Sequence, residues 1–250
     1  MLGAMISVKD LSFGFPGRAL LDNVSFDLKA GSVTCLLGGN GSGKTTLFNL
    51  LSGFLKPEQG SVHLAGVQLD GLPPFQISRL GLSRTFQDLR LIGKLTVAEN
   101  VRLALPNQPG EQLGAALLRT ASVTKFDQKA DQQVQALLAD YFLTNAAGQL
   151  ASEISYGQQK LLTLACCAAM DARVVLLDEP VAGISPEYSL KIVEIVRRLK
   201  ASGKAVLLIE HQADFLEKVG ERFFELEAGQ LYAFRSLDEV RLHRRLSEAN

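Results

Sequence analysis

The sequence lacks the features that define several classes of protein. Its only cysteines among 250 residues are Cys35, Cys166 and Cys167, too few and too poorly spaced for a disulfide framework or a zinc site. The adjacent pair suits reduced thiols. Lysine and arginine total 26, as do aspartate and glutamate, so no excess of basic charge argues for a nucleic-acid partner.

Long apolar runs are also missing. No stretch reaches the roughly 18 residues of a membrane-spanning helix. The first residues lack the basic segment and apolar core of a secretory signal. These absences predict a soluble, intracellular protein, so any action at a membrane requires another subunit to provide the membrane part.

What the sequence does contain is an alternation of apolar strands and amphipathic helices. Residues 174–177 and 204–209 read as buried strands, and residues 187–199 between them have apolar side chains at helical spacing. This order predicts an α/β fold with a parallel sheet covered on both faces. The other expected segments are a β-rich opening at 6–30, a strand at 60–66, a mainly helical stretch at 88–165 and an amphipathic helix at 127–142.

Residues 38–45 read Gly-Gly-Asn-Gly-Ser-Gly-Lys-Thr, which fits the phosphate-binding pattern G-x-x-x-x-G-K-[ST]. Glycines let the backbone wrap closely and aim its N–H groups at phosphate oxygens. Lys44 adds a cation for the β- and γ-phosphates, and the Thr45 hydroxyl suits Mg²⁺. An apolar run before the loop and helical spacing after it give the strand–loop–helix order that the motif requires, which disfavours a simple glycine-rich turn. The predicted nucleotide-binding residues here are Gly38, Gly39, Asn40, Gly41, Ser42, Gly43, Lys44, Thr45 and Thr46.

Two carboxylates follow the first buried strand. Asp178 is predicted to hold Mg²⁺ through water, and Glu179 is predicted to be the general base that activates water for attack on a phosphoryl group. The alternative, an acidic strand end that caps the next helix, is weaker beside a phosphate-binding loop. His211 follows the second buried strand and is predicted to reach the γ-phosphate from the same sheet edge. Lone histidines are more often structural, as we expect for His63 and His243.

Residues 154–159, Ile-Ser-Tyr-Gly-Gln-Gln, precede a helix and lie shortly before the carboxylate pair. Here the chain resembles the ATP-binding cassette (ABC) family, whose signature at this place is Leu-Ser-Gly-Gly-Gln. The resemblance implies that this segment binds the γ-phosphate of an ATP held by a second subunit. A polar helix cap at Ser155 is compatible with that role. The residues that would act in this way are Ser155, Tyr156, Gly157 and Gln158.

The resemblance extends over essentially the whole chain. It implies that Gln87 senses the γ-phosphate and contacts Mg²⁺, and that Phe15 stacks on adenine, with Phe13 as the rival. The implied fold is a P-loop NTPase (RecA-like) core with an antiparallel β subdomain and an inserted α-helical subdomain. The implied bounds are about 1–87 and 166–235 for the core and β subdomain, 88–165 for the helical subdomain and 236–250 for a C-terminal tail.

A narrower likeness rests on two short sequence features, the segment Arg84-Thr-Phe-Gln and Tyr156 of the signature. They resemble the ATPase subunits of branched-chain amino acid importers and their urea or short-chain amide relatives. The chain departs from the wider pattern at Ser185, Leu161, Cys166 and Ala172, none of which is a phosphate, metal or base group.

The resemblance implies an ATPase that uses ATP and Mg²⁺ at the inner, cytoplasmic face of the plasma membrane. Its implied partners are a second ABC ATPase subunit, transmembrane permease subunits and a solute-binding protein, with no nucleic acid. Three alternatives stay open: an export ATPase for lipid or lipopolysaccharide, a regulatory subunit that binds ATP, and a soluble cassette ATPase that works on ribosomes or DNA. The last usually carries two cassettes or a long coiled-coil insertion, which this sequence lacks.

Overall fold

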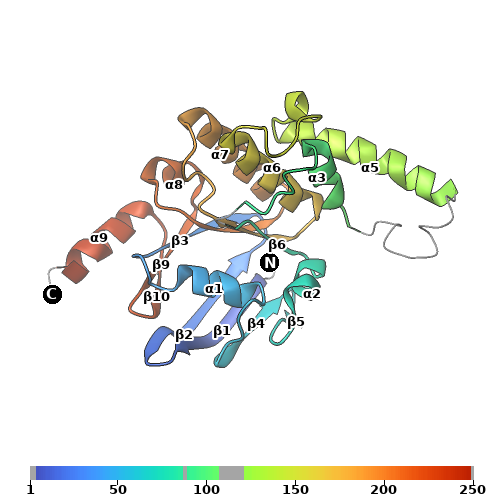
Figure 1. Cartoon of the computed structure of the whole chain (residues 1–250). Helices are drawn as coiled ribbons and strands as arrows, with labels where there is room; N and C mark the ends of the chain where they lie inside the picture. The colour runs from blue at the N-terminus through green and yellow to red at the C-terminus, as the bar shows by residue number, and fades with distance from the viewer. Residues whose placement is uncertain (1–3, 87–88, 107–120, 249–250) are drawn as a thin grey trace. The chain divides into compact units, whose positions relative to one another are not determined.

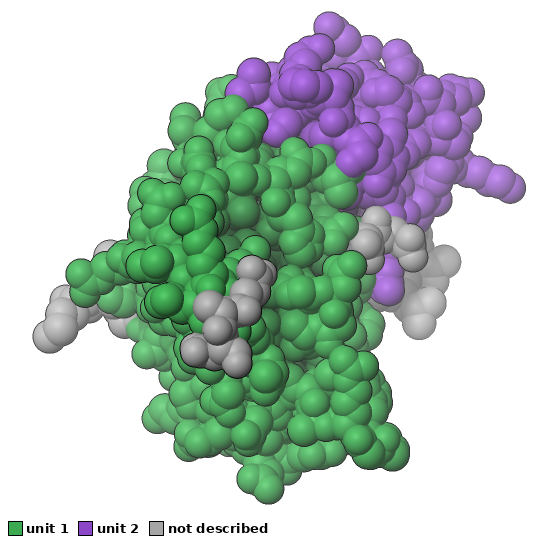
Figure 2. Space-filling model, turned by 90° about the vertical axis from the view of Figure 1, so that its left-hand side faces the viewer, with its two compact units in different colours: residues 1–87, 172–182, 192–250 green, residues 88–171, 183–191 purple. Residues whose placement is uncertain are grey.

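The computed structural model describes residues 4–86, 89–106 and 121–248 (Figure 1). They fall into two compact units (Figure 2). Unit 1 comprises residues 1–87, 172–182 and 192–250, and unit 2 comprises residues 88–171 and 183–191. The functional subdivision given above, with a helical subdomain at about 88–165, stays a prediction. Within the described ranges no helix is long and apolar enough to cross a membrane.

Unit 1 is built around a mainly parallel sheet. Its described strands are β3 (Ser32–Leu37), β6 (Leu82–Arg84), β7 (Val174–Asp178), β8 (Ala205–Ile209), β9 (Arg222–Glu227) and β10 (Gln230–Phe234). Their order across the sheet is β10-β9-β3-β8-β7-β6, and only the β9–β10 pair is antiparallel. β7 and β8 are buried along their whole length, which confirms that the apolar runs are inner strands.

A second, antiparallel sheet in unit 1 has the strand order β2-β1-β4-β5 among the described residues. The bounds of these strands are β1 (Ala4–Phe15), β2 (Arg18–Lys29), β4 (Gln59–Leu64) and β5 (Val67–Gln68). β1 and β2 bury largely alternate residues, as expected for strands with one face on the core. This sheet confirms the β-rich opening and the strand expected near residue 60.

The helices of unit 1 are α1 (Lys44–Leu51), α2 (Pro74–Arg79), α8 (Ala213–Val219), α9 (Leu237–Glu248) and most of α7 (Pro186–Ala201), as Figure 1 shows. One buried apolar cluster includes Ile6 and Leu64 of the antiparallel sheet, Phe48 of α1, and Leu176 and Leu207 of the parallel sheet. The two sheets and α1 therefore share a core, which fixes α1 behind the end of β3.

Unit 2 is helical in its described part. Its elements are α3 (Val97–Leu103), α5 (Ala121–Asp140), the 3-10 turn η2 (Thr144–Ala146), α6 (Tyr156–Ala169) and the first residues of α7. Thr96 caps α3 in a capping box with Glu99, as the pattern Thr-x-x-Glu favours. α5 contains most of the amphipathic segment expected at 127–142, and α7 contains the one expected at 187–199.

Candidate functional site

The glycine-rich loop lies where β3 ends and α1 begins, at the carboxyl edge of the parallel sheet. Gly38 has a φ of 145°, and a Cβ on it would lie 2.5 Å from the carbonyl oxygen of Leu226. Gly43, with a φ of 106°, is the N-cap residue of α1. Only glycine tolerates these positions without strain, because L side chains disfavour the left-handed region. The loop thus presents its backbone and the N-terminus of α1 to an anion.

Lys44 begins α1, and its side chain is folded back into the loop. Nζ donates hydrogen bonds to the carbonyl oxygens of Gly38 and Gly39, both at 2.8 Å, and the residue is only 8% exposed. Burial lowers the pKa of Lys44; Glu179 opposes this change, and the positive charge of Arg244 adds to it. The ammonium group is therefore held inside the loop by two backbone carbonyl groups.

The carboxylate pair ends β7. Asp178 is buried, its backbone N–H donates to Thr85 Oγ1 at 3.0 Å, and its Oδ2 lies 3.3 Å from Arg84 Nη2. Glu179 adopts a φ of 46°, a left-handed conformation that is strained for a residue other than glycine. Such strained residues are often found at functional sites. Its Oε1 lies 3.8 Å from His211 Nε2, so these two side chains face each other across neighbouring strand ends.

A pocket of about 430 Å³ joins these groups within unit 1. We call it the smaller pocket. It is lined by Phe15, Arg18, Leu20, Asn40, Gly41, Gly43, Lys44, Thr45, Thr46, Asp178, Glu179, Ile209 and His211. Most of the predicted nucleotide and catalytic residues of unit 1 thus border one cavity, which contains the oxygen atoms of Thr45 and Asp178, the Lys44 ammonium group and the half-buried carboxylate of Glu179.

The two aromatic candidates at the end of β1 have different environments. Phe15 is 52% exposed and borders the smaller pocket, whereas Phe13 is 9% exposed and belongs to the apolar core. Their rings meet edge to face with centroids 5.3 Å apart. Phe15 is therefore the ring that a planar ligand can reach.

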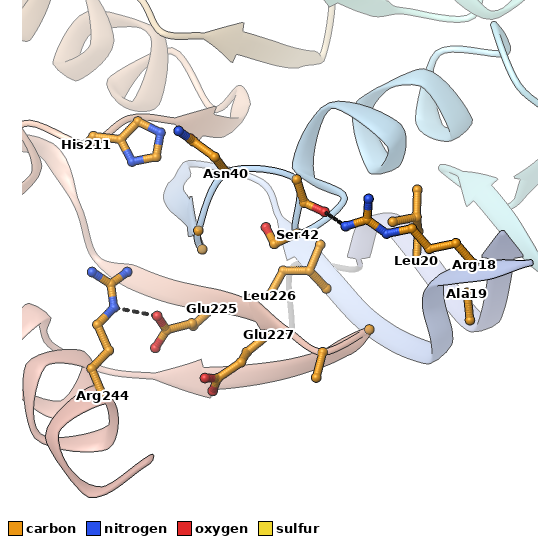
Figure 3. Close-up of a pocket in the computed structure, with 15 residues that line it drawn as sticks. Arg18, Ala19, Leu20, Asn40, Ser42, His211, Glu225, Leu226, Glu227 and Arg244 are labelled. Carbon is orange, nitrogen blue, oxygen red and sulfur yellow. Dashed lines mark hydrogen bonds and ion pairs between the residues drawn. The ribbon is translucent and has the colours of Figure 1, made fainter. Parts of the chain in front are cut away.

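A larger pocket, of about 840 Å³, lies against the glycine-rich loop and is bounded by β9, the β9–β10 turn and α9 (Figure 3). Arg244 of α9 donates from Nε to Glu225 Oε1 at 2.5 Å across this pocket. His211 and Asn40 border both pockets. Gly38, Gly39 and Ser42 of the loop line the larger pocket, whereas Lys44 and the two carboxylates at the end of β7 line the smaller one.

The predicted signature residues lie in unit 2, at the start of α6. Ser155 is the N-cap residue, and its Oγ accepts a hydrogen bond from the backbone N–H of Gln158, whose side chain accepts from Ser155 N in return. The helix-cap reading of Ser155 is thereby confirmed. Tyr156 is 46% exposed. The ring of Tyr188 lies against Gly157, and a Cβ there would lie 2.6 Å from that ring.

Four residues that sequence reasoning gave no role contact the predicted site residues. Thr85 and Arg84 contact Asp178, and Tyr188 contacts the signature. Glu210, only 2% exposed, accepts hydrogen bonds from the backbone N–H groups of Val181 and His211. A charged residue directly after the short apolar strand β8 was the available signal for Glu210. The remaining predicted residue, Gln87, lies outside the described residues.

Comparison with known proteins gives one consistent result. The family described as ABC transporter matches residues 21–182. The high-affinity branched-chain amino acid transport ATP-binding protein LivG of Escherichia coli K12 is 34% identical over 95% of this chain and 93% of its own length. The probable LivG of Archaeoglobus fulgidus is 33% identical over 92% of this chain and 88% of its own length.

Solved structures agree. A nucleotide-free ATP-binding cassette from an ABC transporter is 28% identical, with a TM-score of 0.80 over 96% of this chain and 94% of its own. The ADP conformation of such a cassette is 27% identical, with a TM-score of 0.79 over the same shares of the two chains. The fold prediction, a P-loop NTPase core with an antiparallel sheet and helical elements, is thereby confirmed.

Proposed function

The chain belongs to the ABC transporter family and is an ATP-binding ATPase, and we propose that it powers the import of branched-chain amino acids or of a related small polar solute such as urea or a short-chain amide. The observation that carries the ATP-hydrolysing role is the smaller pocket, in which Lys44, Thr45, Asp178, Glu179 and His211 converge. The class of solute is supported by the similarity to LivG proteins, which are 33–34% identical to this chain over most of its length.

The donor set of the smaller pocket fits a magnesium–nucleotide. Thr45 and Asp178 offer hard oxygen donors, and no group of three or more His, Cys, Asp or Glu side chains among the described residues forms a metal cage. Mg²⁺ typically combines one or two carboxylates with waters and substrate phosphates, which suits so sparse a donor set. When bound, the ion would neutralise charge on the phosphates. We assign Thr45, Asp178 and Gln87 to it.

Each of the remaining site residues has a separate role in ATP binding or hydrolysis. The loop N–H groups and Lys44 bind the β- and γ-phosphates, and Phe15 stacks on adenine. Glu179 orients and deprotonates the attacking water, while His211 contacts the γ-phosphate from the next strand. Because Ser42 Oγ is buried with no hydrogen-bond partner in the described part of the chain, a phosphate oxygen would also give it one.

The complete site needs two subunits. We propose that Ser155, Tyr156, Gly157 and Gln158 act on the ATP of a second ABC ATPase subunit, since a capped helix N-terminus favours an anion. ATP would close the pair, and loss of the γ-phosphate would open it. Permease subunits would turn this cycle into transport at the cytoplasmic face of the plasma membrane, with a solute-binding protein delivering the solute.

Steady-state ATP hydrolysis by the purified chain tests the proposal. Glu179→Gln is expected to lower turnover at least about a hundredfold and to retain ATP, because the base is lost and the phosphate contacts remain. Glu227→Gln is the matched control, since this exposed carboxylate borders the larger pocket instead. Equal turnover of Glu179→Gln and the unaltered chain would remove Glu179 as the base.

The solute is tested separately. The chain is co-expressed with candidate permease subunits, reconstituted in vesicles and supplied with ATP and radiolabelled leucine or urea. ATP-dependent uptake of one of them supports the import proposal. ATP-dependent loss of lipid from the vesicle instead of solute uptake would favour the export alternative.

A further inference from the structure

Arg84 places a buried positive charge beside the carboxylate that we assign to the metal. It ends β6, and the parallel register of β6 with β7 sets Arg84 opposite Leu176, two residues before Asp178. Only 5% of the Arg84 side chain and 7% of the Asp178 side chain are exposed, and Nη2 lies 3.3 Å from Oδ2. The ion pair is therefore largely shielded from water.

The guanidinium is held on several sides by other groups. Nη1 donates to Asn49 Oδ1 at 2.7 Å and to Ser52 Oγ at 3.1 Å, both from α1 or its C-cap. The Arg84 Cζ atom also lies 5.4 Å from the ring centroid of Phe48 and 4.9 Å from that of Phe86. Arginine suits such a place because its planar fork keeps its charge and satisfies several acceptors at once.

This arrangement has two opposite electrostatic effects. A buried carboxylate without a counter-charge is costly, so Arg84 stabilises Asp178 before any metal is present. The same cation repels an incoming Mg²⁺ and competes with it for the carboxylate oxygens. Nucleotide phosphates add negative charge that offsets the repulsion, and loss of the γ-phosphate removes part of that offset.

We propose that Arg84 is the resident counter-charge of Asp178 and that it keeps the affinity of the empty chain for divalent metal low, so that metal is held only together with nucleotide. This inference rests on the proposed function, which assigns the metal to Asp178. It gives Arg84 a role at two steps of the ATPase cycle, before ATP binds and after ATP is hydrolysed. Arg84 would disfavour free metal at Asp178 before ATP arrives, and after hydrolysis it would favour release of the metal with ADP.

Electron paramagnetic resonance of Mn²⁺, used as a probe in place of Mg²⁺, measures this directly without turnover. Arg84→Met is expected to bind Mn²⁺ at least about tenfold more tightly than the unaltered chain, both without nucleotide and with ADP. Arg84→Lys keeps the charge and is expected to stay near the unaltered affinity. The matched control is Arg79→Met, which removes an exposed arginine that also lies over a ring, that of Phe75, but does not contact Asp178.

Two results overturn the inference. One is a folded Arg84→Met chain that binds Mn²⁺ no more tightly than the unaltered chain. The other result concerns the case in which Arg84→Met does not fold. Adding Asp178→Asn removes the unbalanced negative charge and should then restore folding. If the Arg84→Met/Asp178→Asn chain does not fold either, the counter-charge role is refuted. Restored folding supports it.

The parent proposal fails in a different way. If Asp178→Asn leaves Mn²⁺ binding in the presence of ATP unchanged, the assignment of the metal to Asp178 is wrong. If Asp178→Asn weakens that binding while Arg84→Met does not strengthen binding without nucleotide, only the counter-charge inference is wrong.

Discussion

The carboxylate of Glu210 accepts a hydrogen bond from the backbone N–H of Val181 at 3.2 Å, and so ties together the loops that follow β7 and β8. Its other oxygen accepts from the backbone N–H of His211 at 2.8 Å. Glu179 is two residues before Val181, and the segments that carry the proposed base and the histidine thus share one buried anion. We therefore expect this link, together with the pairing of β7 and β8, to hold Glu179 and His211 at their 3.8 Å separation.

Glu210→Gln should therefore lower both stability and turnover. The amide has one acceptor oxygen where the carboxylate has two, and hydrogen bonds to a charged acceptor contribute about 1.5–3 kcal/mol. We expect the free energy of unfolding to fall by about 2 kcal/mol and turnover to fall about tenfold, because misplaced catalytic groups lose rate. Urea unfolding and steady-state ATP hydrolysis measure the two effects, and the affinity for ATP should change little.

Glu221→Gln is the control for that prediction. Glu221 also accepts a backbone hydrogen bond, from Val33 N–H at 3.1 Å, but it lies at the amino end of the sheet. The Glu221→Gln substitution should lower the free energy of unfolding and leave the rate of ATP hydrolysis unaltered. If Glu210→Gln proves as active as Glu221→Gln, Glu210 does not position the two loops.

The sequence was sufficient to place the residues that follow the strands, and the reason is geometric. Parallel strands end at the same sheet edge, and the observed register of β7 with β8 pairs Asp178 with Ile209, so Glu179 and His211 are neighbours. The contacts of Arg84 could not be predicted in this way. They depend on the register of β6 and on which side of α1 faces it, and neither leaves a periodic pattern in so short a strand.

The thiols of buried Cys35 and half-buried Cys166 predict how the free energy of unfolding depends on pH. Burial raises the pKa of Cys35 from 9.0 to about 12, with Glu210 and Glu221 adding to the effect, and burial likewise raises that of Cys166 to about 12. Above pH 9 the unfolded chain loses these protons while the folded chain keeps them. The free energy of unfolding should therefore fall as pH rises from 9 toward 12, by up to about 1.4 kcal/mol per pH unit for each thiol.

Chemical denaturation at several alkaline pH values measures this slope. The Cys35→Ala/Cys166→Ala chain should have a shallower decline, whatever its absolute stability. Lys44 acts in the opposite direction, because its pKa is lowered on folding and the unfolded chain binds more protons below pH 10.5. A decline of equal slope in both chains would show that the thiols do not cause it.

The contact between Gly157 and Tyr188 predicts a coupled pair of substitutions in the signature. Gly157→Ala places a Cβ 2.6 Å from the Tyr188 ring, so the ring must move away from Ser155, whose Oγ donates to the Tyr188 hydroxyl at 3.4 Å. Overpacking costs about 1–3 kcal/mol, whereas alanine gains up to about 1 kcal/mol in helix propensity over glycine. We expect a net loss of about 1 kcal/mol in the free energy of unfolding.

The same substitution in a chain that lacks the Tyr188 ring separates the steric cost from the gain in helix propensity. In Tyr188→Ala, the steric cost disappears and the helix propensity remains, so adding Gly157→Ala should be neutral or stabilising by up to about 1 kcal/mol. Gly148→Ala, at an exposed position of unit 2 with no atom within 4 Å of its new Cβ, controls for the substitution itself and should stay within about 0.5 kcal/mol of the unaltered chain. Urea unfolding of the four chains of the cycle gives the coupling energy. If Gly157→Ala costs the same with and without the tyrosine ring, Tyr188 does not restrict the signature, and its contact with Gly157 has no energetic weight.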